Sequence, residues 1–327
     1  MNAKSATKLL ISLLVLLIAT PIISAGCQEE VEQAPAPPSP GELSSTLVPN
    51  TPLDVYVYAK QDSPTAIPAE MVDVPHDIEV ESFALWGVPA EDKFALGMGL
   101  TLTSARDASK VYAEIDLEKS GWKKLSGNTI YLVYGSGAAA EAVKTAISNN
   151  DFKPYDDSES LKAAATLPEG GTTKLAAIAF AKPSKALIGF LTKDADREGL
   201  EMINLVLKLV NLKIIAAGLY SPHQIDIAKL ARAMESDRSI SKLDLGVLVL
   251  VKSGLPGFLV EPAIEKLLTQ KGFTETNLGG VTLYEGSWAT NAGEALPVLV
   301  RIEDNYIFAA LAGQQSYAET LITSVNK

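Results

Sequence analysis

Alternating apolar and polar positions predict β-strands along the first half of the chain. The period of two is that of a strand with one face buried. Two interruptions, Pro89-Ala90-Glu91-Asp92 and Ser126-Gly127-Asn128, have the composition of hairpin turns. The predicted strands are residues 54–60, 76–82, 83–88, 94–103, 122–125 and 129–134.

A recurrence of apolar residues every three to four positions predicts two helices between and after these strands. The first covers residues 105–118, where Ser104 can cap the first turn and Asp107 follows three residues later. The second covers residues 138–148. The inward faces are predicted to carry Ala108, Val111, Tyr112 and Ile115 in the first helix, and Ala142, Val143, Ala146 and Ile147 in the second.

The second half of the chain continues to alternate predicted strands and helices. The clearest predicted helix covers residues 256–271. It begins with Pro256 and is predicted to carry apolar residues on one face, namely Leu259, Ala263, Ile264, Leu267 and Leu268. The other predicted helices are residues 184–192, 196–211 and 222–234. The predicted strands are residues 175–181, 213–221 and 243–252.

Short stretches of the first half recur in the second half. Residues 119–122 (KSGW) resemble residues 270–273 (QKGF), 151 positions later, and residues 128–131 (NTIY) resemble residues 305–308 (NYIF), 177 positions later. An extra hairpin at about residues 278–303 would account for the different spacing. The predicted fold is therefore α+β, with duplicated β-α-β-β-α units whose mixed or antiparallel sheets are covered by helices. The halves are residues 51–155 and 156–327, and the second half contains the inserted hairpin.

The N-terminal segment has the layout of a secretory signal. Lys4 and Lys8 precede an apolar run at residues 9–18, and small residues at 24–26 lead to Cys27. Residues 1–27 resemble the signal peptides of bacterial-type lipoproteins. The resemblance implies cleavage before Cys27, acylation of Cys27 with a lipid such as palmitate, and a lipid anchor in the cell membrane. The alternative is a retained membrane span at residues 9–26, which gives the same orientation, with the body outside the cytoplasm.

Residues 28–50 are rich in proline and acidic residues and contain no Lys or Arg. Such a composition favours extended polyproline II chain over packed structure. We therefore predict a tether that holds the body away from the membrane. A ligand for a proline-recognition domain is the alternative.

Composition excludes several classes of protein. Of the 327 residues, 47% are hydrophobic and 20% charged, which is typical of a globular chain. The formal net charge of −11 argues against wrapping nucleic acid, which needs a basic face. One Cys and two His exclude an internal disulfide and a cysteine-cluster metal site.

Acidic clusters are the candidates for cation binding. Asp77, Glu79 and Glu81 share one face of a predicted strand and could hold a hard cation such as calcium. A solvated strand face is the favoured interpretation because no calcium-binding loop stands beside them. A solvated loop is favoured in the same way for Asp151, Asp156, Asp157 and Glu159.

No catalytic or cofactor motif is complete. Residues 135–140 (GSGAAA) fit G-x-G-x-x-A, but the chain then runs polar through residues 151–154, where a dinucleotide site needs a strand that ends in an acidic residue. Ser120 and Ser239 begin S-x-x-K tetrads without the partner motifs of serine acyl-enzymes. His223 has no evident partner for acid–base chemistry. We predict no cofactor, no metal and no catalytic residue.

Five aromatic residues in the predicted strands could form a binding platform, although core packing is the ordinary role of such side chains. They are Tyr56, Tyr58, Trp86, Trp122 and Trp288.

These observations predict a lipid-anchored extracytoplasmic protein that acts as a non-catalytic binding or scaffolding module at the cell surface. Its partners would be the membrane, through the lipid, and a protein or small-molecule ligand. The alternatives are the solute-binding lipoprotein of an uptake system and, third, an exported hydrolase. A cleft between the halves would favour the solute-binding protein.

Overall fold

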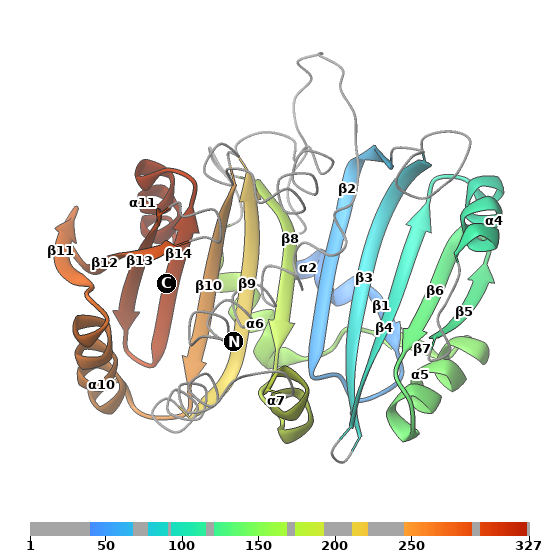
Figure 1. The fold of residues 1–327 in the computed structure, drawn as a ribbon, viewed down its shortest axis with the longest axis horizontal. Coiled ribbons are helices and arrows are strands. Elements are labelled where there is room, and N and C mark those ends of the chain that lie inside the picture. Colours follow the sequence, from blue (N-terminus) through green and yellow to red (C-terminus); the bar gives the residue numbers. More distant parts are fainter. Residues whose placement is uncertain are drawn as a thin grey trace.

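The computed structural model describes residues 40–67, 78–90, 93–115, 121–168, 174–192, 211–221, 245–289 and 295–325. These residues form one twelve-stranded sheet, a separate two-stranded ribbon and helices on both faces of the sheet (Figure 1). Every strand pairing among them is antiparallel. The α+β class predicted from the sequence is therefore confirmed.

The strands follow the chain in a largely meandering order. In the first half they are β2 (Val55–Ile67), β3 (Ile78–Ala90), β4 (Lys93–Leu102), β5 (Gly121–Ser126) and β6 (Thr129–Tyr134). In the second half they are β8 (Lys174–Ala181), β9 (Leu212–Ser221), β10 (Gly246–Ser253), β11 (Thr274–Leu278), β12 (Val281–Ala289), β13 (Ala295–Glu303) and β14 (Tyr306–Ala312). The order across the sheet is β11-β12-β13-β14-β10-β9-β8-β2-β3-β4-β6-β5, so β2 and β8 join the two halves. The ribbon pairs β1 (Leu47–Pro49) with β7 (Phe152–Pro154).

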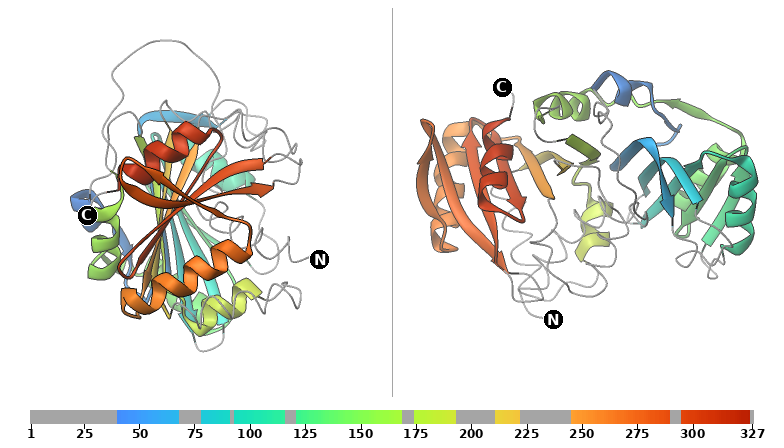
Figure 2. Two further views of the ribbon diagram at one scale, coloured as in Figure 1. Left: turned by 90° about the vertical axis from the view of Figure 1, so that its left-hand side faces the viewer. Right: turned by 90° about the horizontal axis from the view of Figure 1, so that it is seen from above.

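Alternation along the strands gives the sheet two apolar faces. The first face carries Tyr56, Trp86 and Ile178 and is covered by α2 (Pro40–Ser45), α5 (Ala138–Ser148), α6 (Ser158–Thr166) and α11 (Gln315–Thr323). The second face carries Val57 and Leu85 and is covered by α4 (Ala105–Glu114), α7 (Lys185–Thr192) and α10 (Gly257–Gln270). Figure 2 shows α2 and α6 together on one side of the sheet and α7 on the other.

Local sequence signals located most elements correctly. The two predicted hairpins are β3–β4 and β5–β6, and α5 has the predicted bounds. The Ser104 hydroxyl caps α4 by accepting a hydrogen bond from the backbone N–H of Asp107 at 3.4 Å. Residues 78–88, predicted as parts of two strands, belong to the one strand β3. The predicted helices at residues 196–211 and 222–234 lie outside the described residues, except for Asn211.

Two inward helix faces were predicted correctly only in part. In α5, Ala142 is exposed and the buried side chains are Ala139, Ala140, Val143, Ala146 and Ile147. In α10, Val260 and Ile264 are buried, whereas 51% of Leu259 is exposed. Runs of apolar residues fit more than one helix face, so packing against the sheet decides which face is buried.

The predicted tether at residues 28–50 is wrong for its last part. Residues 40–49 form α2 and β1, and Leu43 and Val48 are buried against the first face. These apolar side chains supply burial, and pairing with β7 satisfies the backbone. Residues 28–39 lie outside the described residues. The predicted boundary between residues 155 and 156 and the predicted solvated loop around it also lie in structured chain, since β7 and α6 flank the boundary. We call residues 40–50 and 151–166 together the strap.

The two halves of the sheet share one pairing register. Leu96 of β4 pairs with Tyr134 of β6, and Val247 of β10 pairs with Leu311 of β14, at the two spacings seen in the sequence. The Asn128 amide donates to the Leu102 carbonyl at 2.6 Å, and the Asn305 amide donates in the same way to the Ser253 carbonyl at 3.2 Å.

The register also locates the additional residues of the second half. β13 pairs with β14 as β5 pairs with β6, so the additional strands are β11 and β12. The predicted insertion at residues 278–303 is therefore displaced toward the C-terminus, because it includes β13.

Asp157 holds the strap at the start of α6. Its carboxylate accepts hydrogen bonds from the backbone N–H of Ser160 at 3.2 Å and from the Ser160 hydroxyl, and it pairs with Lys182 at 2.8 Å. We expect Asp157→Ala to lower the free energy of unfolding by about 1 kcal/mol, because the helix loses its N-cap. Urea denaturation measures this change. Asp156→Ala is the control, since among the described residues Asp156 pairs with the exposed side chain of Lys153 alone.

The same carboxylate makes the loss dependent on pH. Burial alone would raise the pKa of Asp157, but hydrogen bonds from Lys182 and Ser160 outweigh it and hold that pKa below its usual value. The stabilisation is therefore complete above the unfolded-state pKa of about 4 and disappears as pH falls through the folded-state pKa. An Asp157→Ala loss that stayed constant down to pH 2 would contradict this role of the charge.

Candidate functional site

A pocket of about 390 Å³ lies between the first face of the sheet and the strap. Strands β2, β3, β4 and β6 form its floor, and the strap with Asn150 beside it forms the opposite wall. Its aromatic lining consists of Tyr56, Tyr58, Trp86, Tyr131 and Phe152. Its polar lining consists of Thr46, Ser82, Thr101, Thr129 and Asn150, and Leu47, Ala84 and Gly99 complete it.

The aromatic rings form a continuous wall from the sheet to the strap. Trp86 and Tyr131 are stacked with ring centroids 6.3 Å apart and planes 24° apart. The Tyr131 ring in turn lies 5.6 Å from the ring of Phe152 on the strap. Trp86 is almost fully buried, whereas Tyr131 and Phe152 are half-buried. Tyr131 and Phe152 can therefore offer ring surface to a bound molecule, with Trp86 behind them.

Small residues on β3 and β4 leave the space. A Cβ atom at Gly99 would lie 2.9 Å from Cη2 of Trp86 and 3.5 Å from Cε1 of Tyr131. Glycine at this position lets the indole ring lie across β4. On the neighbouring strand β3, Ala84 pairs with Gly99. Ala84 and Gly99 together leave open space over the strands that form the floor of the pocket.

A row of hydroxyl groups crosses the floor of the pocket. Ser82, Thr101 and Thr129 are paired neighbours on β3, β4 and β6, and all three are half-buried. The Thr101 and Thr129 hydroxyls lie 3.1 Å apart and share a hydrogen bond. Each hydroxyl can both donate and accept, so the row has hydrogen-bonding capacity left for a ligand. The lining residues that the structure describes carry no charged side chain.

Tyr56 fastens the strap to the sheet at one end of the pocket. Its hydroxyl donates to Oγ1 of Thr46 at 2.6 Å, and the Thr46 hydroxyl donates to the Leu43 carbonyl at 2.7 Å. Burial raises the pKa of Tyr56 well above its usual value, although the bond to Thr46 opposes this, and burial also raises the pKa of Tyr131. Both phenols are therefore neutral at physiological pH.

The corresponding row in the second half of the sheet is different. The shared register places Ile214, Lys252 and Tyr306 where the pocket has Ser82, Thr101 and Thr129. It places fully buried Leu250 where the pocket has Gly99. Thus the hydroxyl row and the glycine belong to the first half alone.

The carboxylates named from the sequence do not gather into a metal site in the described part of the chain. Glu81 is exposed on β3, while Asp77 and the side chain of Glu79 lie outside the described residues. The described residues include no group of three His, Cys, Asp or Glu side chains that could hold a metal ion. Cys27, His76 and His223 also lie outside the described residues.

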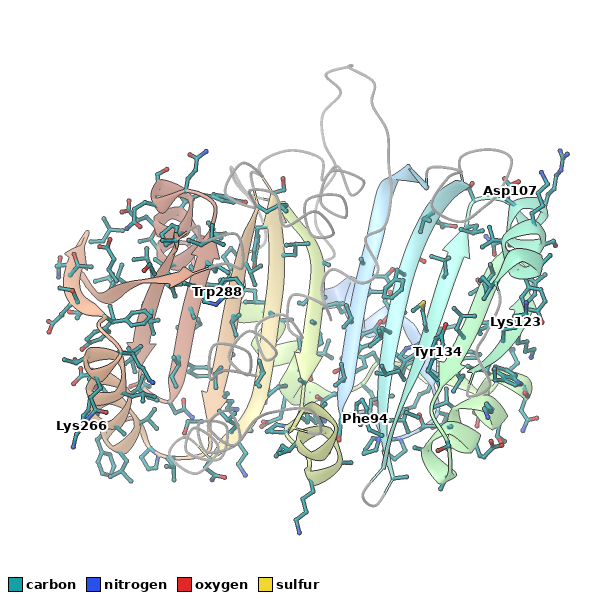
Figure 3. The ribbon with its side chains drawn as sticks, viewed as in Figure 1. Phe94, Asp107, Lys123, Tyr134, Lys266 and Trp288 are labelled. Carbon is teal, nitrogen blue, oxygen red and sulfur yellow. The ribbon has the colours of Figure 1, made fainter. Side chains whose placement is uncertain are left out.

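The other sequence motifs have structural roles where they are described. The G-x-G-x-x-A stretch is the turn from β6 into α5, where Gly135 and Gly137 have φ of 126° and 79°. Lys123, from one S-x-x-K tetrad, donates to the Tyr112 and Ile115 carbonyls at 2.7 and 2.6 Å and so caps the end of α4 (Figure 3). Ser120 and Ser239 lie outside the described residues.

Sequence reasoning found part of the pocket. Tyr56, Tyr58 and Trp86 belong to it, whereas Trp122 and Trp288 do not line it. Figure 3 shows Trp288 in one half of the sheet and Tyr134 in the other half. Tyr131, Phe152 and the hydroxyl row were missed. The hydroxyl row had a sequence signal, namely a Ser or Thr on each strand at a position that faces inward, where the other inward-facing residues are apolar.

Comparisons of the chain with protein-family models and with curated proteins found no match. Among solved structures, the chain is similar to crystal form III of TP0453, with 11% identity and a TM-score of 0.39 over 85% of this chain and 96% of that chain. Crystal form IV of TP0453 gives 10% identity and a TM-score of 0.35 over 86% and 99% of the two chains. Within the described residues, no helix has the length and apolar character needed to cross a membrane.

Proposed function

We propose that this chain is a lipid-anchored protein, facing outside the cytoplasm, that binds a small molecule without catalysis in the pocket beneath the strap. The observation that carries the binding role is the pocket of about 390 Å³ with an aromatic wall and a row of hydroxyl groups. Concave sites with apolar walls and a few placed polar groups are the usual form of ligand sites. The lipid anchor rests on the signal sequence that ends at Cys27.

The pairing of β2 with β8 argues against the alternative function, that of a solute-binding lipoprotein of an uptake system. A solute-binding lipoprotein of an uptake system closes two lobes around a cleft, and its hinge needs freedom between the lobes. Here Val55–Tyr58 of β2 pair with Ile178–Ala181 of β8, so one sheet runs through both halves. This continuity favours a rigid binding module over a hinged transport receptor.

We further infer that the two halves arose from one duplicated β-α-β-β-α unit. The identical register, the paired roles of Asn128 and Asn305, and the placement of α4 with α10 and of α5 with α11 on the same faces support this origin. The pocket then reflects divergence between the two copies, one with glycine and hydroxyls where the other has Leu250 and Ile214. An experimental structure with α4 and α10 on opposite faces would contradict the duplication.

A ligand screen with a filled pocket tests the binding function. Ser82→Ile gives the pocket the residue that the second half has at the corresponding position, and Ile suits a strand. We expect some compounds to raise the thermal unfolding midpoint of the wild-type protein by several degrees and to leave that of Ser82→Ile unchanged.

Ser287→Ile on β12 is the matched control, because Ser287 is exposed and outside the pocket. It should respond to the compounds as the wild type does. If no compound raises the wild-type midpoint, or if Ser82→Ile responds equally, the pocket is not the binding site.

A further inference from the structure

The side chains that line the pocket indicate which chemical class of ligand it binds. The pocket offers two kinds of surface side by side, namely half-buried aromatic rings and a row of hydroxyl groups. A purely apolar ligand would cover the Ser82 hydroxyl and the hydrogen-bonding capacity that Thr101 and Thr129 keep beyond their shared bond, at a cost of roughly 1–3 kcal/mol per unsatisfied polar group. The ligand must therefore carry hydrogen-bonding groups of its own along one edge.

Charge limits the ligand further. The described residues that line the pocket supply no charged side chain to pair with a charged group. An ionised group placed there would lose its hydration without gaining a partner among these residues, which is strongly unfavourable. The formal net charge of −11 adds a general repulsion against anions.

The aromatic wall sets the shape of the remaining face. The rings of Tyr131 and Phe152 are half-buried and pack on each other, with centroids 5.6 Å apart and planes 34° apart, so a ligand meets their exposed surface and does not enter a slot between them. An aromatic face favours apolar C–H surface, and the hydroxyl row favours O–H groups.

We propose that the pocket binds a neutral saccharide, with its C–H face against Tyr131 and Phe152 and its hydroxyl groups on the row formed by Ser82, Thr101 and Thr129. This inference rests on the proposed binding function and adds the class of ligand. Tyr131 also lines the pocket, and its hydroxyl, neutral because burial raises its pKa, is a further possible donor. A volume of about 390 Å³ is within the range of small-molecule sites and has room for a mono- or disaccharide.

Isothermal titration calorimetry on the purified protein tests the class. The probes are glucose, N-acetylglucosamine and maltose as neutral saccharides, glucuronate as the charged counterpart of glucose, and indole as a planar aromatic. We expect at least one neutral saccharide to bind with measurable affinity. Glucuronate should bind at least roughly tenfold more weakly than glucose, because its carboxylate has no partner.

Removal of one hydroxyl distinguishes a saccharide from an apolar ligand. Thr101→Val keeps the shape of the side chain, and we expect it to weaken saccharide binding roughly tenfold, as loss of one ligand hydrogen bond in a buried site does. Thr282→Val, at an exposed position of β12, is the control and should change nothing. Thr129→Val replaces Thr101→Val if the latter fails to fold.

The outcomes separate the two proposals. Binding of indole that Ser82→Ile abolishes, without binding of any saccharide, would overturn the saccharide inference and leave the binding function standing. Saccharide binding that Thr101→Val and Thr129→Val leave unchanged would also overturn it. If neither the saccharides nor indole nor any screened compound binds, both proposals fail.

Discussion

Replacing Cys27 with Ser should abolish incorporation of a fatty acid into the protein. Cys27 is the sole cysteine, and it follows an apolar segment and the small residues Ala25 and Gly26. A bacterial host grown with a labelled palmitate analogue should label the wild-type chain and leave Cys27→Ser unlabelled. The expected effect is all-or-none, because no second thiol exists to accept the lipid.

A matched variant and the apparent mass complete this experiment. Leu47→Ala should be labelled like the wild type, because it lies well beyond the signal segment. Cys27→Ser should run at a higher apparent mass, since cleavage before a lipidated cysteine no longer takes place. An unlabelled wild-type chain of full length would replace the lipid anchor with a retained span at residues 9–26.

Leu43→Ala should destabilise the protein by about 2–5 kcal/mol. Leu43 is fully buried in the core on the first face, although it belongs to a proline-rich stretch. The substitution removes apolar burial and leaves a cavity in the core on the first face. Urea denaturation followed by circular dichroism gives the free energy of unfolding.

Leu47→Ala is the matched control for the strap. It is the same substitution four residues later, but 61% of Leu47 is exposed. We expect a change within about 0.5 kcal/mol. Equal effects of the two substitutions would mean that residues 40–49 do not dock on the sheet.

Sequence periodicity predicted elements better than it predicted their packing. The turn residues at 126–128 and the cap at Ser104 act within a few residues of chain, so their signals are local and were interpreted correctly. The inward face of α10 depends on which side meets the sheet, and that contact is not local. Composition suggested a tether at residues 28–50 because prolines outnumber the few apolar residues that actually anchor the strap.

The pocket shows the same division between local and non-local information. Trp86 and Tyr56 were recognisable as aromatic candidates on predicted strands. Phe152, which packs on Tyr131, lies 66 residues beyond Trp86 in the chain, among acidic residues predicted to form a solvated loop. Gly99 was not informative alone, because its role depends on the indole ring that crosses it.

Fluorine NMR tests most directly whether ligands occupy the pocket beneath the strap. The chain has three tryptophans, so protein labelled with 5-fluorotryptophan should give three resonances, which Trp122→Phe and Trp288→Phe assign by elimination. Trp86 alone of the three lines the pocket. We expect a compound that stabilises the protein to shift the Trp86 resonance and to leave those of Trp122 and Trp288 in place. A shift confined to Trp122 or Trp288, or no shift with any stabilising compound, would contradict the account.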